Sequence, residues 1–257
     1  MHSNADCRKD TGMHLNKITI DAQKFPTREQ YPFNLDIFNQ TQAISLDLPV
    51  SFFVGENGSG KSTLLKAIAR KCGIHIWSGI QTPRFKKSPY EDQLYHAVRV
   101  ECKEGEVSGS FFASQIFQNF SRSLDAWAQA DPEIINYFGG KSLMAQSHGE
   151  SLMSFFKSRF SIKGLYLLDE PETALSPKSL LELLQLLIRM SQSGHAQFII
   201  ATHSPILMAC PGSTIFSFDQ IPLGAIEYEK TEHYRIYKKF MQDRNRYINP
   251  VVAGATD

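Results

Sequence analysis

The sequence predicts an α/β protein built on a parallel sheet, and two observations carry this prediction. Short runs that are apolar throughout are typical of strands covered on both faces, and three occur: "VSFFV" (50–54), "GLYLLDE" (164–170) and "QFIIATHS" (197–204). Helical patterns separate them, among them "SLLELLQLLIRM" (179–190), which is apolar on most sides and which we expect to be covered on both. Because ligands bind at the carboxyl ends of parallel strands, we expect a site at that edge.

The remaining elements follow in chain order. Residues 1–15 are expected to be disordered, "KITI" (17–20) to form a short strand and "IHIW" (74–77) another. The runs "YHAVRVE" (95–101) and "VSGSFFA" (107–113) flank "CKEGE", which predicts a hairpin in an antiparallel β subdomain. A helical period then begins and predicts a short helical insert over 114–163, carried by Ile116, Phe117, Phe120, Leu124 and Trp127. We expect residues 1–257 to form one domain.

Composition narrows the function classes. The chain has 257 residues, of which 42% are hydrophobic and 21% charged, as in ordinary globular proteins. A formal net charge of +1 gives no global attraction to nucleic acid or anionic lipid. The four cysteines lack C-x-x-C spacing, which favours free thiols in a reducing compartment. Without an apolar leader or an apolar run of about 18 residues, we expect no secretory signal, no membrane span and a cytoplasmic location.

A glycine-rich loop follows the first buried strand. "GENGSGKST" (55–63) fits G-x-x-x-x-G-K-[ST] with Gly55, Gly60, Lys61 and Ser62. Its backbone N–H groups and the next helix N-terminus suit a phosphate, Lys61 suits the outer phosphates, and the Ser62 hydroxyl can ligate Mg²⁺. We therefore predict nucleotide binding, and the expected contacts also include the other loop residues Asn57, Gly58, Ser59 and Thr63.

The next two buried strands end in groups that suit nucleotide hydrolysis. Asp169 ends one strand, where a carboxylate can hold Mg²⁺, and Glu170 follows it, placed to accept a proton from an attacking water. His203 ends the other strand and can hydrogen-bond a γ-phosphate or the attacking water. A guanine-reading N-K-x-D motif is absent, since "NKIT" (16–19) has Thr19 where Asp is needed, which favours ATP.

With these motifs in this order, the chain resembles an ATP-binding-cassette (ABC-type) ATPase. "GENGSGKST" is similar to that superfamily's Walker A, "LYLLDEP" to its Walker B with catalytic glutamate, "TALSP" to its D-loop and "ATHSP" to its switch-histidine loop. More closely, the chain is similar to the small stand-alone "predicted ATPase" or "AAA family ATPase" group, so a P-loop NTPase fold with an ABC-type core sheet is implied. The resemblance also implies that Gln115 is the Q-loop glutamine, a ligand of Mg²⁺ with a part in catalysis.

"QSHGES" (146–151) lies where the superfamily has its L-S-G-G-Q signature, with Ser147 and Gly149 matching and His148 and Glu150 departing. The resemblance then implies a homodimer that sandwiches two ATP molecules, each capped by the other chain's Ser147 and Gly149. A soluble ATPase that uses this dimerisation to drive or signal a change in a protein or nucleic-acid effector, in DNA transactions or phage defence, is the favoured function. The alternative is the ATP-binding subunit of a membrane transporter.

An aromatic residue that stacks on the adenine is expected upstream of the loop. Two residues of "QYPF" fit this expectation equally, Tyr31 and Phe33.

Overall fold

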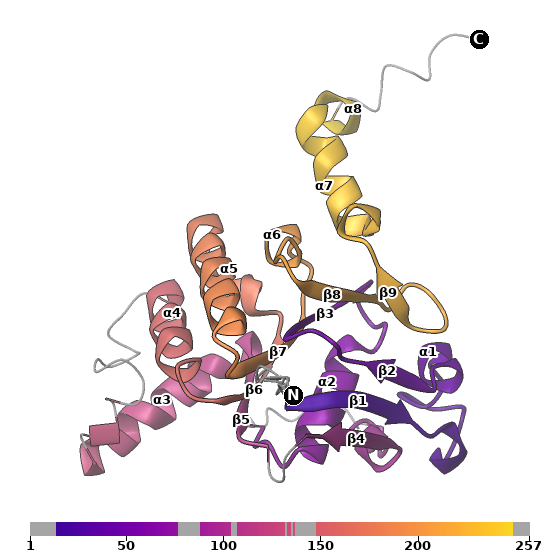
Figure 1. Ribbon diagram of the computed structural model, residues 1–257, viewed down its shortest axis with the longest axis horizontal. Coiled ribbons are helices and arrows are strands. Elements are labelled where there is room, and N and C mark those ends of the chain that lie inside the picture. Colours follow the sequence, from indigo (N-terminus) through magenta and orange to yellow (C-terminus); the bar gives the residue numbers. More distant parts are fainter. Residues whose placement is uncertain are drawn as a thin grey trace, which may run out of the picture.

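The computed structural model describes residues 14–76, 88–103, 107–131, 133, 134, 136 and 148–248. Within them, the larger sheet has six strands in the order β5-β6-β7-β3-β8-β9 (Figure 1). Strands β5 to β8 and β3 run parallel, whereas β9 is antiparallel to β8. The predicted parallel α/β sheet is therefore confirmed, with strands β3 (Val50–Val54), β5 (Gly109–Ala113), β6 (Gly164–Asp169), β7 (Ala196–Ala201), β8 (Ser213–Ser217) and β9 (Gly224–Ile226).

A smaller antiparallel sheet has the order β2-β1-β4, with β1 (Leu15–Ile20), β2 (Ala43–Ser45) and β4 (Val98–Cys102). The predicted hairpin is wrong, because β4 pairs with β1 while β5 joins the larger sheet parallel to β6. Burial explains the difference. Phe111, Phe112 and Ala113 of β5 are consecutively buried, as in a strand covered on both faces, whereas exposure alternates along β4.

The described helices are α1 (Asp36–Gln40), α2 (Lys61–Lys71), α3 (Ser114–Ala130), α4 (His148–Arg159), α5 (Pro177–Gln192), α6 (Pro205–Met208), α7 (Glu232–Gln242) and α8 (Asn245–Ile248). Short 3-10 turns complete the described elements: η1 (Ala22–Lys24), η2 (Leu94–His96), η4 (Pro171–Ala174) and η5 (Tyr228–Lys230). Helix α2 packs between the two sheets, and α3 to α6 pack on the opposite face. Along β3 the side chains alternate between these two layers, with Phe53 in the first and Phe52 in the second.

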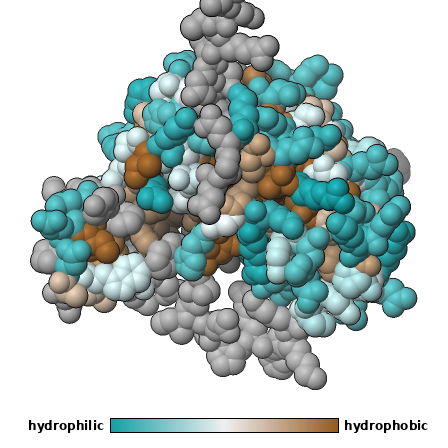
Figure 2. Space-filling view, turned by 60° about the horizontal axis from the view of Figure 1, so that its bottom comes forward, coloured by the Kyte–Doolittle hydropathy of each residue, from teal (hydrophilic) through white to brown (hydrophobic). Residues whose placement is uncertain are grey.

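The C-terminal helices α7 and α8 extend away from both sheets (Figure 1). Large apolar side chains on them are exposed, namely Ile236, Tyr237, Phe240, Met241, Tyr247 and Ile248. Over the face drawn in Figure 2, hydrophilic residues predominate on the right and hydrophobic residues form separate small groups. None of the helices in the described part of the chain combines the length and apolar character needed to cross a membrane.

Three smaller expectations are corrected. Leu15 is fully buried at the start of β1, so the disorder expected for residues 1–15 does not extend to it, and residues 1–13 lie outside the described part. Residues 74–76 form no strand, because Ile74 N–H donates to Ala69 O and closes the end of α2 around Gly73, which has the positive φ of a helix stop. On α5 only one side is buried, and Leu181 on the other is 51% exposed.

Gln197 of β7 joins the two sheets. Its side chain is fully buried, and its Oε1 accepts from the N–H groups of His14 (2.9 Å) and Leu15 (2.8 Å). Its Nε2 donates to Leu15 O at 2.8 Å. The start of β1 is thus tied to the larger sheet through one side-chain amide.

We expect Gln197→Leu to lower the free energy of unfolding by about 3 kcal/mol, because buried backbone groups of β1 lose their partners. Urea denaturation followed by circular dichroism measures this. The matched control is Lys17→Gln, which removes only the exposed ion pair with Glu101 (3.8 Å) and should cost less than about 0.5 kcal/mol. Equal stability of the two variants would contradict the assigned role of Gln197.

Candidate nucleotide-binding site

The loop after β3 is shaped by glycines at positions where a side chain has no room. A Cβ on Gly60, which has φ +104°, would lie 2.7 Å from Phe38 Cζ. Helix α2 begins at the next residue, and no side chain caps it, so its first N–H groups are available to an anion. Ser59 Oγ is buried without a hydrogen-bond partner among the described residues. These features suit a bound phosphate.

Lys61 is 5% exposed, and its Nζ donates to Gly55 O at 2.6 Å and Glu56 O at 2.7 Å. Burial lowers the pKa of its ammonium, while nearby carboxylates, with Glu170 foremost, oppose that change. A desolvated cation held by loop carbonyls is a favourable partner for a polyphosphate.

Ser62 and Asp169 hydrogen-bond at the carboxyl ends of the parallel strands. Ser62 Oγ donates to Asp169 Oδ1 at 2.7 Å. Burial raises the pKa of the Asp169 carboxyl, and the Ser62 hydrogen bond opposes the rise. A hydroxyl and a carboxylate side by side are hard oxygen donors of the kind Mg²⁺ prefers, so the residues present fit this ion.

Glu170 follows Asp169 in a strained backbone conformation. Its φ of 47° is positive, which among the described non-glycine residues occurs only here. The surroundings hold it there, because its N–H donates to Ala201 O (2.9 Å) and its carbonyl accepts from Ser114 Oγ (2.6 Å). Strain of this kind is typical of functional positions. Glu170 Oε1 lies 3.8 Å from His203 Nε2.

His203 is held at its backbone and its ring. Its N–H donates to Glu172 Oε1 at 2.6 Å, and its Nδ1 lies 2.9 Å from Nε2 of His233 on α7. Burial, then the charges of Lys61 and His233, lower the pKa of the imidazole. Its Nε2 is buried without a hydrogen-bond partner in the described part of the chain. The free ring nitrogen therefore lies beside Glu170.

The structure thus brings together Lys61, Ser62, Asp169, Glu170 and His203, as the sequence predicts. Gln115 lies at the start of α3, which follows the strand paired with β6, but its side chain is outside the described residues.

The expected signature segment is described only from its helix onward. Gly149 lies in the first turn of α4, where a Cβ would be 3.8 Å from Ala174 O and 3.9 Å from Ser179 Oγ. Ser147 falls outside the described residues. Gly149 therefore lies against the turn that follows Glu170 and against the start of α5.

The two aromatic candidates for an adenine contact differ in exposure. Phe33 is 1% exposed and packs against Phe25, with ring centroids 4.8 Å apart, so it has no face to offer a base. Tyr31 is partly exposed, and its hydroxyl hydrogen-bonds Thr63 Oγ1 at the end of the phosphate loop. Burial thus leaves Tyr31 as the candidate.

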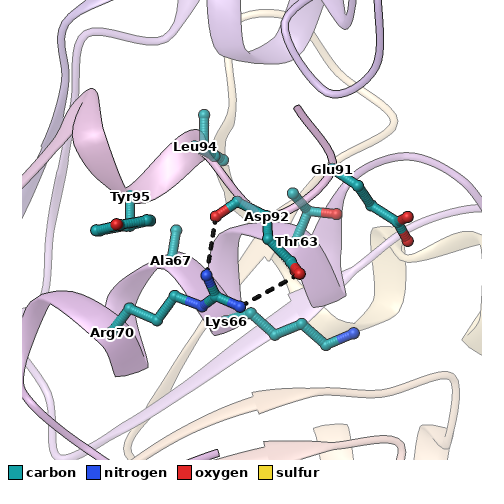
Figure 3. A pocket seen from close by; sticks show the side chains of 8 residues that line it. All are labelled: Thr63, Lys66, Ala67, Arg70, Glu91, Asp92, Leu94 and Tyr95. Atoms are coloured by element: carbon teal, nitrogen blue, oxygen red, sulfur yellow. Dashed lines mark hydrogen bonds and ion pairs between the residues drawn. The ribbon is translucent and has the colours of Figure 1, made fainter. Parts of the chain in front are cut away.

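A small hollow of about 30 Å³ lies along α2 beyond Thr63 (Figure 3). Arg70 and Asp92 bridge it, with Arg70 Nη2 3.3 Å from Asp92 Oδ2 and Nη1 3.1 Å from the Asp92 carbonyl (Figure 3). Two of the four charged side chains that line it therefore pair with each other.

Three residues of the site were missed from sequence. Glu172 lies two positions after Glu170, and Asp219 ends the apolar run "TIFSFD", the same signal that identified Asp169. Asp219 Oδ1 accepts from Glu56 N–H at 2.8 Å and so supports the phosphate loop. His233 lies inside a helical pattern and has no local signal.

Residues 152–209 match the model of a protein family described as "AAA domain, putative AbiEii toxin, Type IV TA system". This stretch contains Asp169, Glu170 and His203. Over these residues the chain is similar to an AAA domain. The matched stretch therefore carries part of a site that is similar to an ATPase nucleotide-binding domain. No curated protein matches the chain.

The chain is also similar to solved structures, three of which follow. A putative metal-chelate type ABC transporter in an inward-facing conformation is 20% identical over 76% of this chain and 80% of its own, with a TM-score of 0.47. The SMC head domain from Thermotoga maritima is 15% identical over 84% and 100%, with a TM-score of 0.47. CbiO1 from Clostridium perfringens, part of the ABC transporter complex cbiONQ, is 16% identical over 91% and 97%, with a TM-score of 0.47.

We expect Asp219→Ala to raise the dissociation constant for a non-hydrolysable ATP analogue about fivefold, because the loop loses the acceptor that orders Glu56. Isothermal titration calorimetry measures this. Asp219→Asn keeps an acceptor oxygen and removes only the charge, so it should bind at least as well as the unmodified protein. Unchanged affinity in Asp219→Ala would refute the supporting role.

Proposed function

We propose that the protein is an ATPase that binds ATP with Mg²⁺, hydrolyses it, and dimerises with ATP bound. The observation that carries the proposal is the 2.7 Å hydrogen bond from Ser62 to Asp169, which joins the phosphate loop to the strand end that leads into Glu170. A loop that only binds phosphate does not need a carboxylate, a strained glutamate and a histidine at its open side. Hydrolysis does.

Each group has a chemical part. The loop N–H groups and Lys61 bind the outer phosphates, and Lys61 leaves its carbonyl partners to do so. Ser62 and Asp169 would hold Mg²⁺, with Gln115 as a further ligand, and the ion when bound neutralises charge on the phosphates. Glu170 accepts a proton from the attacking water, and His203 Nε2–H donates to the γ-phosphate.

The proposed dimer follows from the side of the phosphates that the loop of one copy does not contact. The loop grips the phosphates from one side, and Gly149 lies beside the turn after Glu170 rather than in the loop. We propose that Ser147, Gly149 and the N-terminus of α4 cap the ATP of a second copy, in a two-fold arrangement. Hydrolysis then removes the bridge and releases the two copies, and a protein or nucleic-acid effector responds to this change.

The nucleoside end has one candidate contact. Tyr31, held by Thr63 beside the loop, is proposed to stack on the adenine.

We expect Glu170→Gln to bind ATP with nearly unchanged affinity and to lose turnover by at least about 100-fold, because it lacks only the proton acceptor. Phosphate release and calorimetry measure the two properties. Lys61→Ala is the contrasting variant, and it should weaken ATP binding itself. Turnover near that of the unmodified protein in Glu170→Gln would reject Glu170 as the base.

We expect the Glu170→Gln protein to be monomeric without nucleotide and dimeric with ATP and Mg²⁺, because ATP supplies the contact between copies. Light scattering coupled to gel filtration measures the mass. Ser147→Arg in that background should abolish the dimer and spare ATP binding. Ser161→Arg, at an exposed position two residues beyond the end of α4, is the matched control and should leave the dimer intact. A constant mass under all conditions would disprove the sandwich.

A further inference from the structure

The contact between His203 and His233 joins the candidate site to a helix outside the matched family segment. His233 lies in the first turn of α7, 30 residues beyond His203. The ring nitrogens Nδ1 of His203 and Nε2 of His233 are 2.9 Å apart, and the ring centroids 5.0 Å apart at 54°. This geometry is a hydrogen bond between two imidazoles and not a stack.

The number of protons on the His203 ring bears on which of the two histidines donates this hydrogen bond. A neutral imidazole carries one N–H, and the partial burial of His203 favours that form. If Nδ1 held the proton, Nε2 would be a bare acceptor beside Glu170 and unable to donate to a phosphate oxygen. If His233 Nε2–H donates to His203 Nδ1, the proton of His203 must reside on Nε2. Only the second arrangement equips His203 for its part in hydrolysis.

We propose that His233 is a positioning residue, which fixes the tautomer and orientation of the His203 ring by donating a hydrogen bond to Nδ1. This inference rests on the proposed role of His203 in hydrolysis. Glu172 holds the His203 backbone through a separate bond of 2.6 Å, so the two residues fix different parts of it. The ATPase site thereby includes α7.

Helix α7 has other anchors, so removal of the His233 nitrogen does not detach it. Thr231 caps its first turn, with Oγ1 accepting from Tyr234 N–H at 3.4 Å. The Tyr234 ring lies 4.6 Å from that of Tyr228, whose hydroxyl donates to Pro205 O at 3.1 Å. A variant at His233 can therefore fold and report on the hydrogen bond alone.

The test compares His233→Phe, which keeps a ring without nitrogen, with His233→Gln, whose amide can donate from a similar position. We expect His233→Phe to lower kcat for ATP about tenfold with KM within about twofold, and His233→Gln to recover most of the loss. Tyr237→Phe, on the exposed side of the same helix, is the control and should match the unmodified protein. Equal kcat in His233→Phe and the unmodified protein overturns the proposal, as does an equal loss in His233→Gln.

A double variant separates this proposal from the proposed function. His203→Ala should itself lower kcat strongly, and adding His233→Phe should cause no further loss, because the two residues act as one unit. If His203→Ala is impaired but His233→Phe is not, only the positioning role fails. If His203→Ala turns over normally, the proposed part of His203 fails and this inference fails with it.

A readout without turnover completes the test. Long-range ¹H–¹⁵N spectra of histidine-labelled protein report which ring nitrogen carries the proton, with His203→Ala identifying the signals. We expect His203 as the Nε2–H tautomer, and loss of that single tautomer in His233→Phe but not in His233→Gln. A proton on His203 Nδ1 in the unmodified protein overturns the proposal whether or not ATP is hydrolysed.

Discussion

The register of three parallel strands is the constraint on which the site depends. Strand β7 lies between β3 and β6, and its Ala201 is level with both Phe53 and Asp169. The ladder continues one step beyond the strands, because Glu170 N–H donates to Ala201 O and Thr202 N–H to Phe53 O. The segments that follow β3, β6 and β7 thus leave the sheet at the same level. Ser62, in the helix that follows β3, can therefore reach Asp169 of β6 although β7 lies between these two strands. A shift of one residue in β7 would move His203 out of line with Glu170.

The fixed register of these strands lets the site hold groups whose burial or backbone conformation would destabilise the fold elsewhere. Around the phosphate loop lie a buried lysine and a glutamate with positive φ. Buried side-chain atoms of Ser59, Glu172 and His203 also have no hydrogen-bond partner among the described residues. Each is unfavourable in the absence of a ligand. Two apolar layers, one around α2 and one under α3 to α6, offset this cost by fixing the strands from both faces. Unfavourable burial and backbone strain that gather at one place in an otherwise regular structure are typical of a functional site.

The parts of this arrangement that the sequence predicts are those whose signal is local. A glycine spacing, an apolar run and the acid that ends it lie within a few residues of one another, so the loop, the buried strands and Asp169 with Glu170 could be predicted. Pairing between distant segments could not: β4 and β5 resemble the arms of a hairpin, and only their burial separates them into two sheets. Asp219 and Glu172 act through single hydrogen bonds to backbone far along the chain. Such bonds leave no periodicity to detect.

The position of His233 has a thermodynamic consequence. Helix α7 extends from the sheets, exposes several apolar side chains, and carries a residue bonded to the ring beside Glu170. If that bond orients His203 for the γ-phosphate, any displacement of α7 changes the contacts that ATP makes. Linkage is reciprocal, so occupancy of the site must bias the position of α7 by the same free energy. One hydrogen bond can transmit only about 1 kcal/mol, which shifts an equilibrium about fivefold. This coupling is too small to switch the proposed ATPase activity fully on or off alone. It is large enough to link the rate of that proposed activity to the position of α7.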